Sequence, residues 1–386
     1  MLMNYHRVPR EAVEQSSCRI NMMTRSLCLV ACAAAFAPGP GLRQPRQRSA
    51  LAATQLEQLA AMTTLSIDTG DLDVIETYAA TGLITDATTN PLFVAQAGTS
   101  GDARYVAFVD KAIAYAKEHA AGGDVTALAM DRLAVELGLE IVKLVPGYVS
   151  TEVDIRASFD TEESVARARR IIAMYEAEGV DRSRVLVKLA GTWEGIKAAE
   201  ILEKEGITCN ITLVFGFAQA VAAAQANARL ISPFPGRIKD WHGANGGEAT
   251  YEPAEDPGVV EVARIYAYYK KHGHGTICMP ASWRPSRGTS DPSYAVDEIL
   301  ALAGTDRMTI PPPLLELLAS SDEPVPRKLE PARAAAACAD AELVYDESSF
   351  RLAMNADLAA TTKLAEGINA FIGETAKLQA AIEAKV

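Results

Sequence analysis

From Leu56 to the C-terminus, short apolar segments alternate with longer segments in which apolar residues recur at helical spacing. Short apolar runs bounded by turn residues predict strands that are buried on both faces, as in parallel sheets. Eight strands are predicted, at Thr64–Asp68, Leu83–Ala87, Gly147–Glu152, Val185–Leu189, Cys209–Val214, Arg229–Pro233, Thr276–Ala281 and Arg307–Ile310.

The segments between these strands predict amphipathic helices. One of them places Val165, Ala168, Ile172 and Tyr175 on a single face. Helices are predicted at Tyr105–His119, Thr126–Leu144, Glu163–Glu178, Trp193–Lys204, Phe217–Asn227, Gly258–Lys271 and Ala295–Ala303. Eight alternating units favour a single α/β domain, a (β/α)8 TIM barrel, over an open doubly wound sheet, because no Gly-x-Gly-x-x-Gly motif follows the first strand.

Two further segments complete the predicted barrel domain, which spans residues 56–386. Ala356–Val386 is strongly helical and is expected to supply extra C-terminal helices that pack on the barrel. Ser320–Asp340 is rich in proline, alanine and charge, and it is predicted to be a long irregular link.

Residues 1–55 differ from the rest, since they carry arginines but no lysine and few acids. Within them Arg25 precedes the apolar stretch Ser26–Ala35 and then Phe36. Positive charge, apolar core and small residues in that order are typical of a secretory signal, and the basic segment Gly39–Leu51 resembles a transit peptide. One prediction is a bipartite targeting leader to a plastid. The alternatives are a disordered extension on a cytoplasmic enzyme, or a start misassigned before Met22.

Composition narrows the classes of ligand. The net charge of −12 argues against nucleic acid, because phosphate backbones require basic surfaces, and no apolar run is long enough to span a bilayer. No cysteine pairs with another cysteine or a histidine at metal-ligand spacing, and the five histidines do not cluster with carboxylates, so no metal is expected. No nucleotide-binding loop is present, and no cofactor is expected. Cys209, Cys278 and Cys338 are predicted to be reduced, buried thiols. Assembly as a homodimer is one expectation.

A lysine lies inside an apolar strand. Lys188 sits within Val185–Ala190, where strand alternation places it either in the barrel interior or in the helix layer. Burial makes a charged amine costly, and a neutral lysine is a nucleophile for ketones. Lys188 would otherwise be a structural lysine that pairs with an acid or reaches the rim. Lys143, in Ile141–Leu144, is a similar lysine that the pattern barely separates from it.

A colinear set of motifs resembles the transaldolases over nearly all of residues 56–386. The motifs are Asp68–Asp71, Thr85–Pro91, Lys143–Asp154, Val187–Gly195, Asn210–Leu213, Ile231–Arg237, Ala281–Arg284 and Lys363–Ile368. The resemblance implies an enzyme of the non-oxidative pentose phosphate pathway with sugar phosphates as its partners. It would transfer a dihydroxyacetone unit from sedoheptulose 7-phosphate or fructose 6-phosphate to glyceraldehyde 3-phosphate or erythrose 4-phosphate.

The resemblance also implies roles for individual residues. Lys188 would form a Schiff base with the donor, and Asp68 would take the proton of the hydroxyl that becomes the leaving aldehyde. Glu152 and Thr212 would position a water that shuttles protons. The expected substrate contacts are Asn90, Asn210 and Ser232 for hydroxyl groups, with Phe234 beside them, and Arg237, Ser282 and Arg284 for the phosphate. Structural alternatives remain: Asn90 before a proline suits a turn, Glu152 suits a counter-ion, and Thr212 suits a strand.

Two features of the sequence bear on alternative functions. An added segment, Pro285–Ala295, follows Arg284 and would either cover the site or displace that arginine. Phe234 stands where the related fructose 6-phosphate aldolases place a tyrosine that helps to activate water. An aldolase-like lyase, which shares the lysine and the barrel, is the nearest alternative, and because a phenylalanine cannot activate water, transfer is expected to outcompete release. A non-catalytic sugar-phosphate-binding barrel is the other alternative. A barrel without catalytic activity would not need to keep Lys188, Asp68 and Glu152 together.

Overall fold

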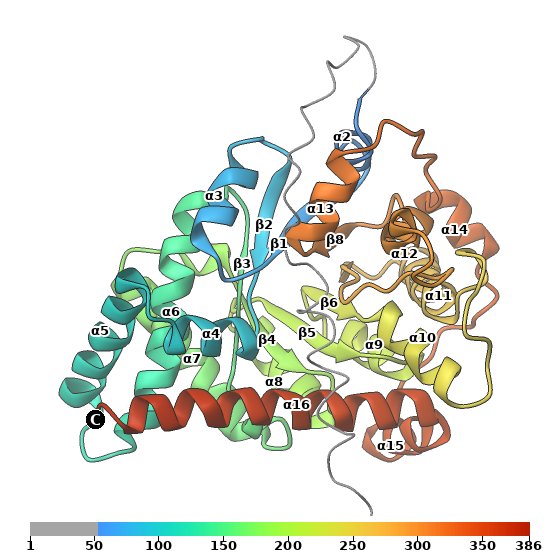
Figure 1. The fold of residues 1–386 in the computed structure, drawn as a ribbon. Coiled ribbons are helices and arrows are strands. Elements are labelled where there is room, and N and C mark those ends of the chain that lie inside the picture. The colour runs from blue at the N-terminus through green and yellow to red at the C-terminus, as the bar shows by residue number, and fades with distance from the viewer. Residues whose placement is uncertain (1–52) are drawn as a thin grey trace, which may run out of the picture. The chain divides into compact units, whose positions relative to one another are not determined.

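The structure, a computed structural model, describes residues 53–386. Within them eight parallel strands form one sheet in the order β7-β6-β5-β4-β3-β2-β1-β8, with helices around it (Figure 1). The strands are β1 (Thr64–Asp68), β2 (Ile84–Thr88), β3 (Val149–Glu152), β4 (Val185–Ala190), β5 (Cys209–Val214), β6 (Leu230–Pro233), β7 (Ile277–Cys278) and β8 (Arg307–Ile310). The predicted (β/α)8 barrel is confirmed.

The barrel is nearly closed at a seam between β7 and β8. The backbone N–H of Thr309 donates to the carbonyl oxygen of Pro280 at 3.2 Å. Lower on the seam, a carboxylate oxygen of Asp306 accepts from the backbone N–H of Cys278 at 3.1 Å. β7 is shorter than the predicted Thr276–Ala281. Beyond Cys278, the N–H groups of Met279 and Ala281 still donate to the carbonyl oxygens of Ile231 and Pro233 at 2.9 Å, but Pro233 has no backbone N–H to return a bond and extend the paired strand.

Helices and short 3-10 turns fill the connections between strands. They are α2 (Gln55–Ala60), α3 (Leu72–Ala79), α4 (Pro91–Thr99), α5 (Ala103–His119), α6 (Val125–Leu144), η1 (Ile155–Ala157), α7 (Thr161–Ala177), η2 (Arg182–Arg184), α8 (Trp193–Lys204), α9 (Phe217–Gln225), α10 (Pro235–Ala244), α11 (Pro257–His272), η3 (Pro292–Val296), α12 (Asp297–Ala301), α13 (Pro312–Ala319), α14 (Pro331–Ala337), α15 (Glu347–Ala356) and α16 (Leu358–Glu383). Side-chain caps begin many of them. The carboxylates of Asp102 and Asp124, for example, accept from backbone N–H groups in the first turns of α5 and α6.

The extra C-terminal helices are also confirmed. α16 is the long red helix of Figure 1, and it packs against α4, α6, η1 and α10. Those elements follow β2, β3 and β6 in the chain, so α16 crosses the barrel at the carboxyl ends of its strands. The irregular link predicted at Ser320–Asp340 is wrong in part, because α14 lies within it. Its alanines favour helix, Pro331 opens the first turn, and the carboxylate of Glu330 caps it.

The thiol prediction is confirmed for two of three cysteines. Cys209 and Cys278 are buried, and they and Cys338 are free thiols. Cys338 is only half-buried, so the expectation that all three are buried is wrong for it, because it caps the surface helix α14. The predicted leader, apart from its last three residues, and its cysteines lie outside the described residues. Between residues 53 and 386, no helix is both long enough and apolar enough to cross a bilayer.

Candidate active site

Lys188 lies in the interior of the barrel. It is on β4, its side chain is 7% exposed, and its Nζ lies 3.1 Å from an oxygen of Glu152. Nζ also donates to the carbonyl oxygen of Thr89 at 2.9 Å. Glu152 and Lys188 are register partners on β3 and β4, so the parallel ladder itself sets them side by side. Lys143 is 64% exposed and pairs with Glu140 at 2.7 Å, which separates the two lysines that the sequence pattern did not.

Two carboxylates accompany this lysine. Asp68 ends β1 and Glu152 ends β3. Burial raises the pKa of Asp68, while the hydroxyl of Thr88, which donates to it at 2.6 Å, and the charge of Lys188 oppose that rise. Burial likewise raises the pKa of Glu152 against the attraction of Lys188. A raised pKa makes a carboxylate a stronger proton acceptor, so both groups suit acid–base work.

A cavity of about 140 Å³ opens at the carboxyl ends of the strands, and Asp68 and Lys188 line it. Six other predicted site residues line it as well: Asn90, Thr212, Ser232, Phe234, Arg237 and Ser282. Glu152 lies behind Lys188 and is not part of the wall. None of the lining residues comes from the added segment Pro285–Ala295, so that segment does not cover the cavity.

The polar residues of β5 and β6 form one hydrogen-bonded group. Ser232 donates to the side-chain oxygen of Asn210 at 2.8 Å, and the amide of Asn210 donates to Ser150 at 3.4 Å. Asn210 is fully buried and supports Ser232 rather than lining the cavity. The register of β5 shifts beside Leu213, where φ is 55°. The hydroxyl of Thr212 is buried, and it makes no hydrogen bond within residues 53–386.

Asn90 has the structural role that was its alternative to substrate binding, since it caps the start of a helix. Its side-chain oxygen accepts from the backbone N–H groups of Leu92 and Phe93, at 3.0 and 3.2 Å, and so begins α4. Asn90 also lines the cavity. The two roles are compatible, because an amide side chain has donors as well as an acceptor.

One half-buried arginine lines the same cavity. Arg237, in the first turn of α10, has its guanidinium carbon 5.2 Å from the centre of the Phe234 ring. Burial and the nearby Arg284 cation lower the pKa of Arg237. Arg284 does not line the cavity, and its Nε lies 3.1 Å from Asp240. Ser282, with φ of 63°, is a non-glycine residue in the left-handed region, a conformation whose cost is typical of functional sites.

Five lining residues were not among the sequence predictions: Thr88, Leu92, Ala281, Thr309 and Phe371. Thr88 is the last residue of β2, so a strand-end criterion finds it, whereas Leu92 lies in the first turn of α4 and carries no such signal. Phe371 comes from α16, more than a hundred residues beyond β6, and only the packing of that helix across the barrel brings it to the cavity.

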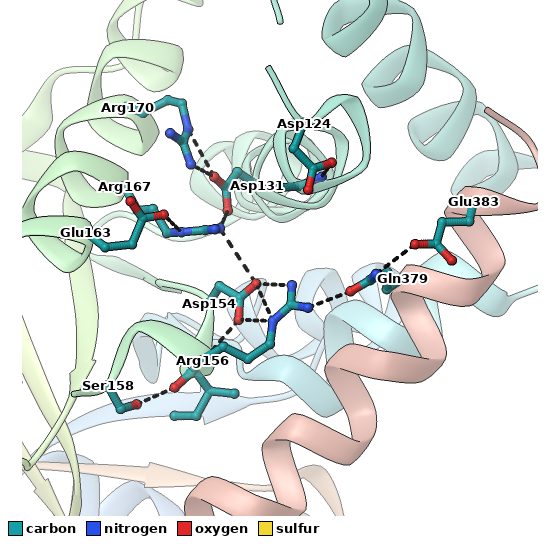
Figure 2. Close-up of polar contacts among 12 residues, drawn as sticks. Asp124, Asp131, Asp154, Arg156, Ser158, Glu163, Arg167, Arg170, Gln379 and Glu383 are labelled. Carbon is teal, nitrogen blue, oxygen red and sulfur yellow. Dashed lines mark hydrogen bonds and ion pairs between the residues drawn. The ribbon is translucent and has the colours of Figure 1, made fainter. Parts of the chain in front are cut away.

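A charged network holds α16 in this position. Arg156, in η1 just after β3, donates to Gln379 of α16 at 2.5 Å (Figure 2). Its other nitrogens bind the buried Asp154, which is also 3.6 Å from Arg167 of α7. Burial favours the neutral form of Asp154, but the hydrogen bonds from Arg156 outweigh it and hold the pKa of that carboxyl below its ordinary value. The network thus ties the end of β3 to the helix that carries Phe371.

A parallel barrel with a buried lysine between two carboxylates, at the carboxyl ends of its strands, defines the class of Schiff-base barrel enzymes. Within residues 53–386, no group of three or more acidic, histidine or cysteine side chains converges as metal ligands would. The chain belongs to the transaldolase/fructose-6-phosphate aldolase family, whose model matches residues 65–382.

Named relatives agree with this family. The transaldolase of Cellvibrio japonicus is 50% identical over 326 residues, which cover 84% of this chain and 97% of that protein. The transaldolase of Pseudoalteromonas atlantica is 47% identical over 333 residues, and that of Actinobacillus succinogenes is 46% identical over 334 residues. Each of these two alignments covers 86% of this chain and 99% of the relative.

Proposed function

We propose that this chain is a transaldolase that carries a dihydroxyacetone unit from a ketose phosphate to an aldose phosphate on Lys188. The observation that carries the proposal is the position of the Lys188 amine, buried in the barrel beside Glu152 and in one cavity with Asp68. Family membership supports the same reaction.

The first step is Schiff-base formation. Glu152 is close enough to take a proton from the Lys188 ammonium, since the two groups are 3.1 Å apart, and burial makes that carboxylate a good acceptor. The free amine attacks the ketone carbon, and the carbonyl oxygen leaves as water to give an iminium. The unpartnered hydroxyl of Thr212 is available to bind that water.

The second step is cleavage of the adjacent carbon–carbon bond. Asp68 takes the proton of the hydroxyl on the carbon that becomes the aldehyde, and the bonding electrons move to the iminium nitrogen. The aldose phosphate leaves, and the three-carbon enamine stays on Lys188. Ser232, oriented by Asn210, and Asn90 are placed to bind its hydroxyl groups. Attack on a second aldose phosphate, followed by hydrolysis of the new Schiff base, completes the transfer.

The donor phosphate is expected to bind Arg237, which lines the cavity and is held against Phe234. Ser282 lines the same cavity and supplies a hydroxyl. Arg284 is a weaker candidate than the resemblance implies, because Asp240 already binds its guanidinium. It reaches a phosphate only if that pair opens.

Phe234 favours transfer over release of free dihydroxyacetone. Its ring packs edge-on against Phe215, with ring centres 5.5 Å apart, and it offers no hydroxyl to orient water toward the enamine. The Phe234→Tyr variant should therefore release dihydroxyacetone from fructose 6-phosphate faster, without an acceptor, than the unmodified protein does. Equal release rates would remove this residue as the discriminator.

Chemical trapping tests the proposal directly. Borohydride with fructose 6-phosphate should attach a three-carbon adduct to Lys188, as read by peptide mass. Lys188→Ala should abolish both the adduct and the activity. Lys143→Ala is the matched control, since that exposed lysine pairs with Glu140 away from the cavity, and it should keep both. An adduct on Lys143, or full activity without Lys188, would refute the proposal.

A further inference from the structure

Two threonines that the mechanism does not use form a chain of hydroxyl groups that ends on Asp68. The hydroxyl oxygen of Thr88 lies 2.6 Å from an oxygen of Asp68, and the hydroxyl oxygen of Thr309 lies 2.7 Å from that of Thr88. Both threonines are 3% exposed and line the cavity. They come from β2 and β8, the two strands that flank β1, so they approach Asp68 from opposite sides of its strand.

The direction of this chain follows from counting protons. An ionised carboxylate only accepts, so the single hydroxyl proton of Thr88 points to Asp68. The Thr88 oxygen then has only lone pairs to offer Thr309, so Thr309 must be the donor between them. A hydroxyl that accepts a hydrogen bond becomes a stronger donor. Thr309 therefore strengthens the bond that reaches Asp68, although it does not touch that carboxylate.

Thr309 is itself fixed in position. The indole N–H of Trp283 donates to its carbonyl oxygen at 2.8 Å, and its own N–H donates across the seam to Pro280. Trp283 follows Ser282 of the cavity wall. The backbone of Thr309 is thus held at both its N–H and its carbonyl oxygen.

We propose that Thr309 is a positioning residue that, through Thr88, holds Asp68 ionised and aimed at the substrate hydroxyl. The inference rests on the proposed role of Asp68 as the base. Burial raises the pKa of Asp68, and the hydroxyl chain opposes that rise, so the chain widens the pH range in which the base is ready. The other charged groups around the cavity are Lys188 on β4, Glu152 on β3 behind it, and Arg237 on α10.

The pH profile of kcat/KM for fructose 6-phosphate tests this role. Thr309→Val keeps the shape of the side chain and removes its hydroxyl, and it should move the acidic limb of the pH profile to higher pH by about half a pH unit. Thr88→Val should move this limb by about one pH unit. The Thr88→Val, Thr309→Val double variant should show no shift beyond that of Thr88→Val, because Thr309 acts through Thr88. Thr309→Ser retains a hydroxyl and should keep the pH profile of the unmodified protein.

Two controls separate the alternatives. Thr305→Val removes a buried hydroxyl that donates to the carbonyl of Cys278, away from Asp68, and should leave the profile unchanged. Borohydride trapping in Thr309→Val should still label Lys188. Absence of labelling on Lys188 in the unmodified protein would instead count against the proposed function. An unshifted acid limb with a raised KM would show that Thr309 binds substrate directly and would overturn the inference. So would shifts that add in the double variant.

Discussion

Glu261 on α11 should make the folded protein lose stability as pH rises through neutrality. Its side chain is 20% exposed, and burial raises its pKa to about 7. The charges of Asp357 and Asp340 add to the rise, and Arg264, 3.9 Å away, only partly offsets it. Asp357 is the residue whose carboxylate caps the start of α16. The titration therefore occurs beside the anchor of the helix that crosses the active site.

The magnitude follows from the linkage between protonation and folding. The folded-state pKa of Glu261, about 7, exceeds its ordinary value of 4.5, so the folded protein binds this proton more tightly than the unfolded chain does. The stabilisation is complete below pH 4.5 and is lost as pH rises through about 7. At about 1.36 kcal/mol per pKa unit, the full effect is about 3 kcal/mol, of which roughly 2 to 3 kcal/mol falls between pH 5 and 8.

Urea denaturation at pH 5 and pH 8 measures this effect. Glu261→Gln should stabilise the protein relative to the unmodified chain at pH 8 by about 2 kcal/mol or more, and the difference should shrink at pH 5. Glu255→Gln, at an exposed position just before α11, is the matched control and should not change the pH dependence. If the two variants respond to pH in the same way, Glu261 is not the titrating group and the reasoning fails.

Three other substitutions test the packing and charges around the site. Gly367→Ala would place a Cβ 2.8 Å from Leu213 and 3.5 Å from Arg237, so it should lower the free energy of unfolding by about 1–3 kcal/mol, and an unchanged urea midpoint would contradict this. Arg237→Ala should raise KM for fructose 6-phosphate roughly 10- to 100-fold in steady-state assays, whereas Arg284→Ala should raise it less, and the reverse order would reassign the phosphate contact. Arg156→Gln should destabilise the protein at pH 7, as calorimetry would measure. The loss should shrink as pH falls through the range of Asp154, whose stabilising ionised form exists only above it; a loss independent of pH would exclude this carboxylate as the cause.

The sequence predicted the barrel well because its strands are short apolar runs. β1, β5 and β8 lie at the predicted residues, and α8 does as well. The prediction failed where local composition and tertiary contacts disagree. The helix predicted at Ala295–Ala303 is divided into η3 and α12, since the turn that begins at Pro292 imposes a tighter start.

Some active-site residues could be predicted from the sequence, and others could be found only from the fold. Lys188 could be singled out because it interrupts an apolar strand, which periodicity reveals, whereas Asp68 and Glu152 gained their roles from the resemblance to the transaldolases. The pattern could not distinguish Lys188 from Lys143, since both lie in apolar runs and only the fold shows which one faces inward. Phe371 carried no local signal, because its position depends on a helix that packs across the barrel.

The seam between β7 and β8 is a place where a barrel of this kind can accommodate extra residues. Few backbone bonds join these two strands, so the connection between them need not keep a fixed spacing over a long ladder. Residues 285–295, which the resemblance to the transaldolases identifies as an added segment, fall in this connection. Insertions elsewhere would have to preserve the hydrogen-bonded register between neighbouring strands. A pair of strands joined by few hydrogen bonds is therefore the place where such a barrel can take up extra residues without disturbing the remaining strands.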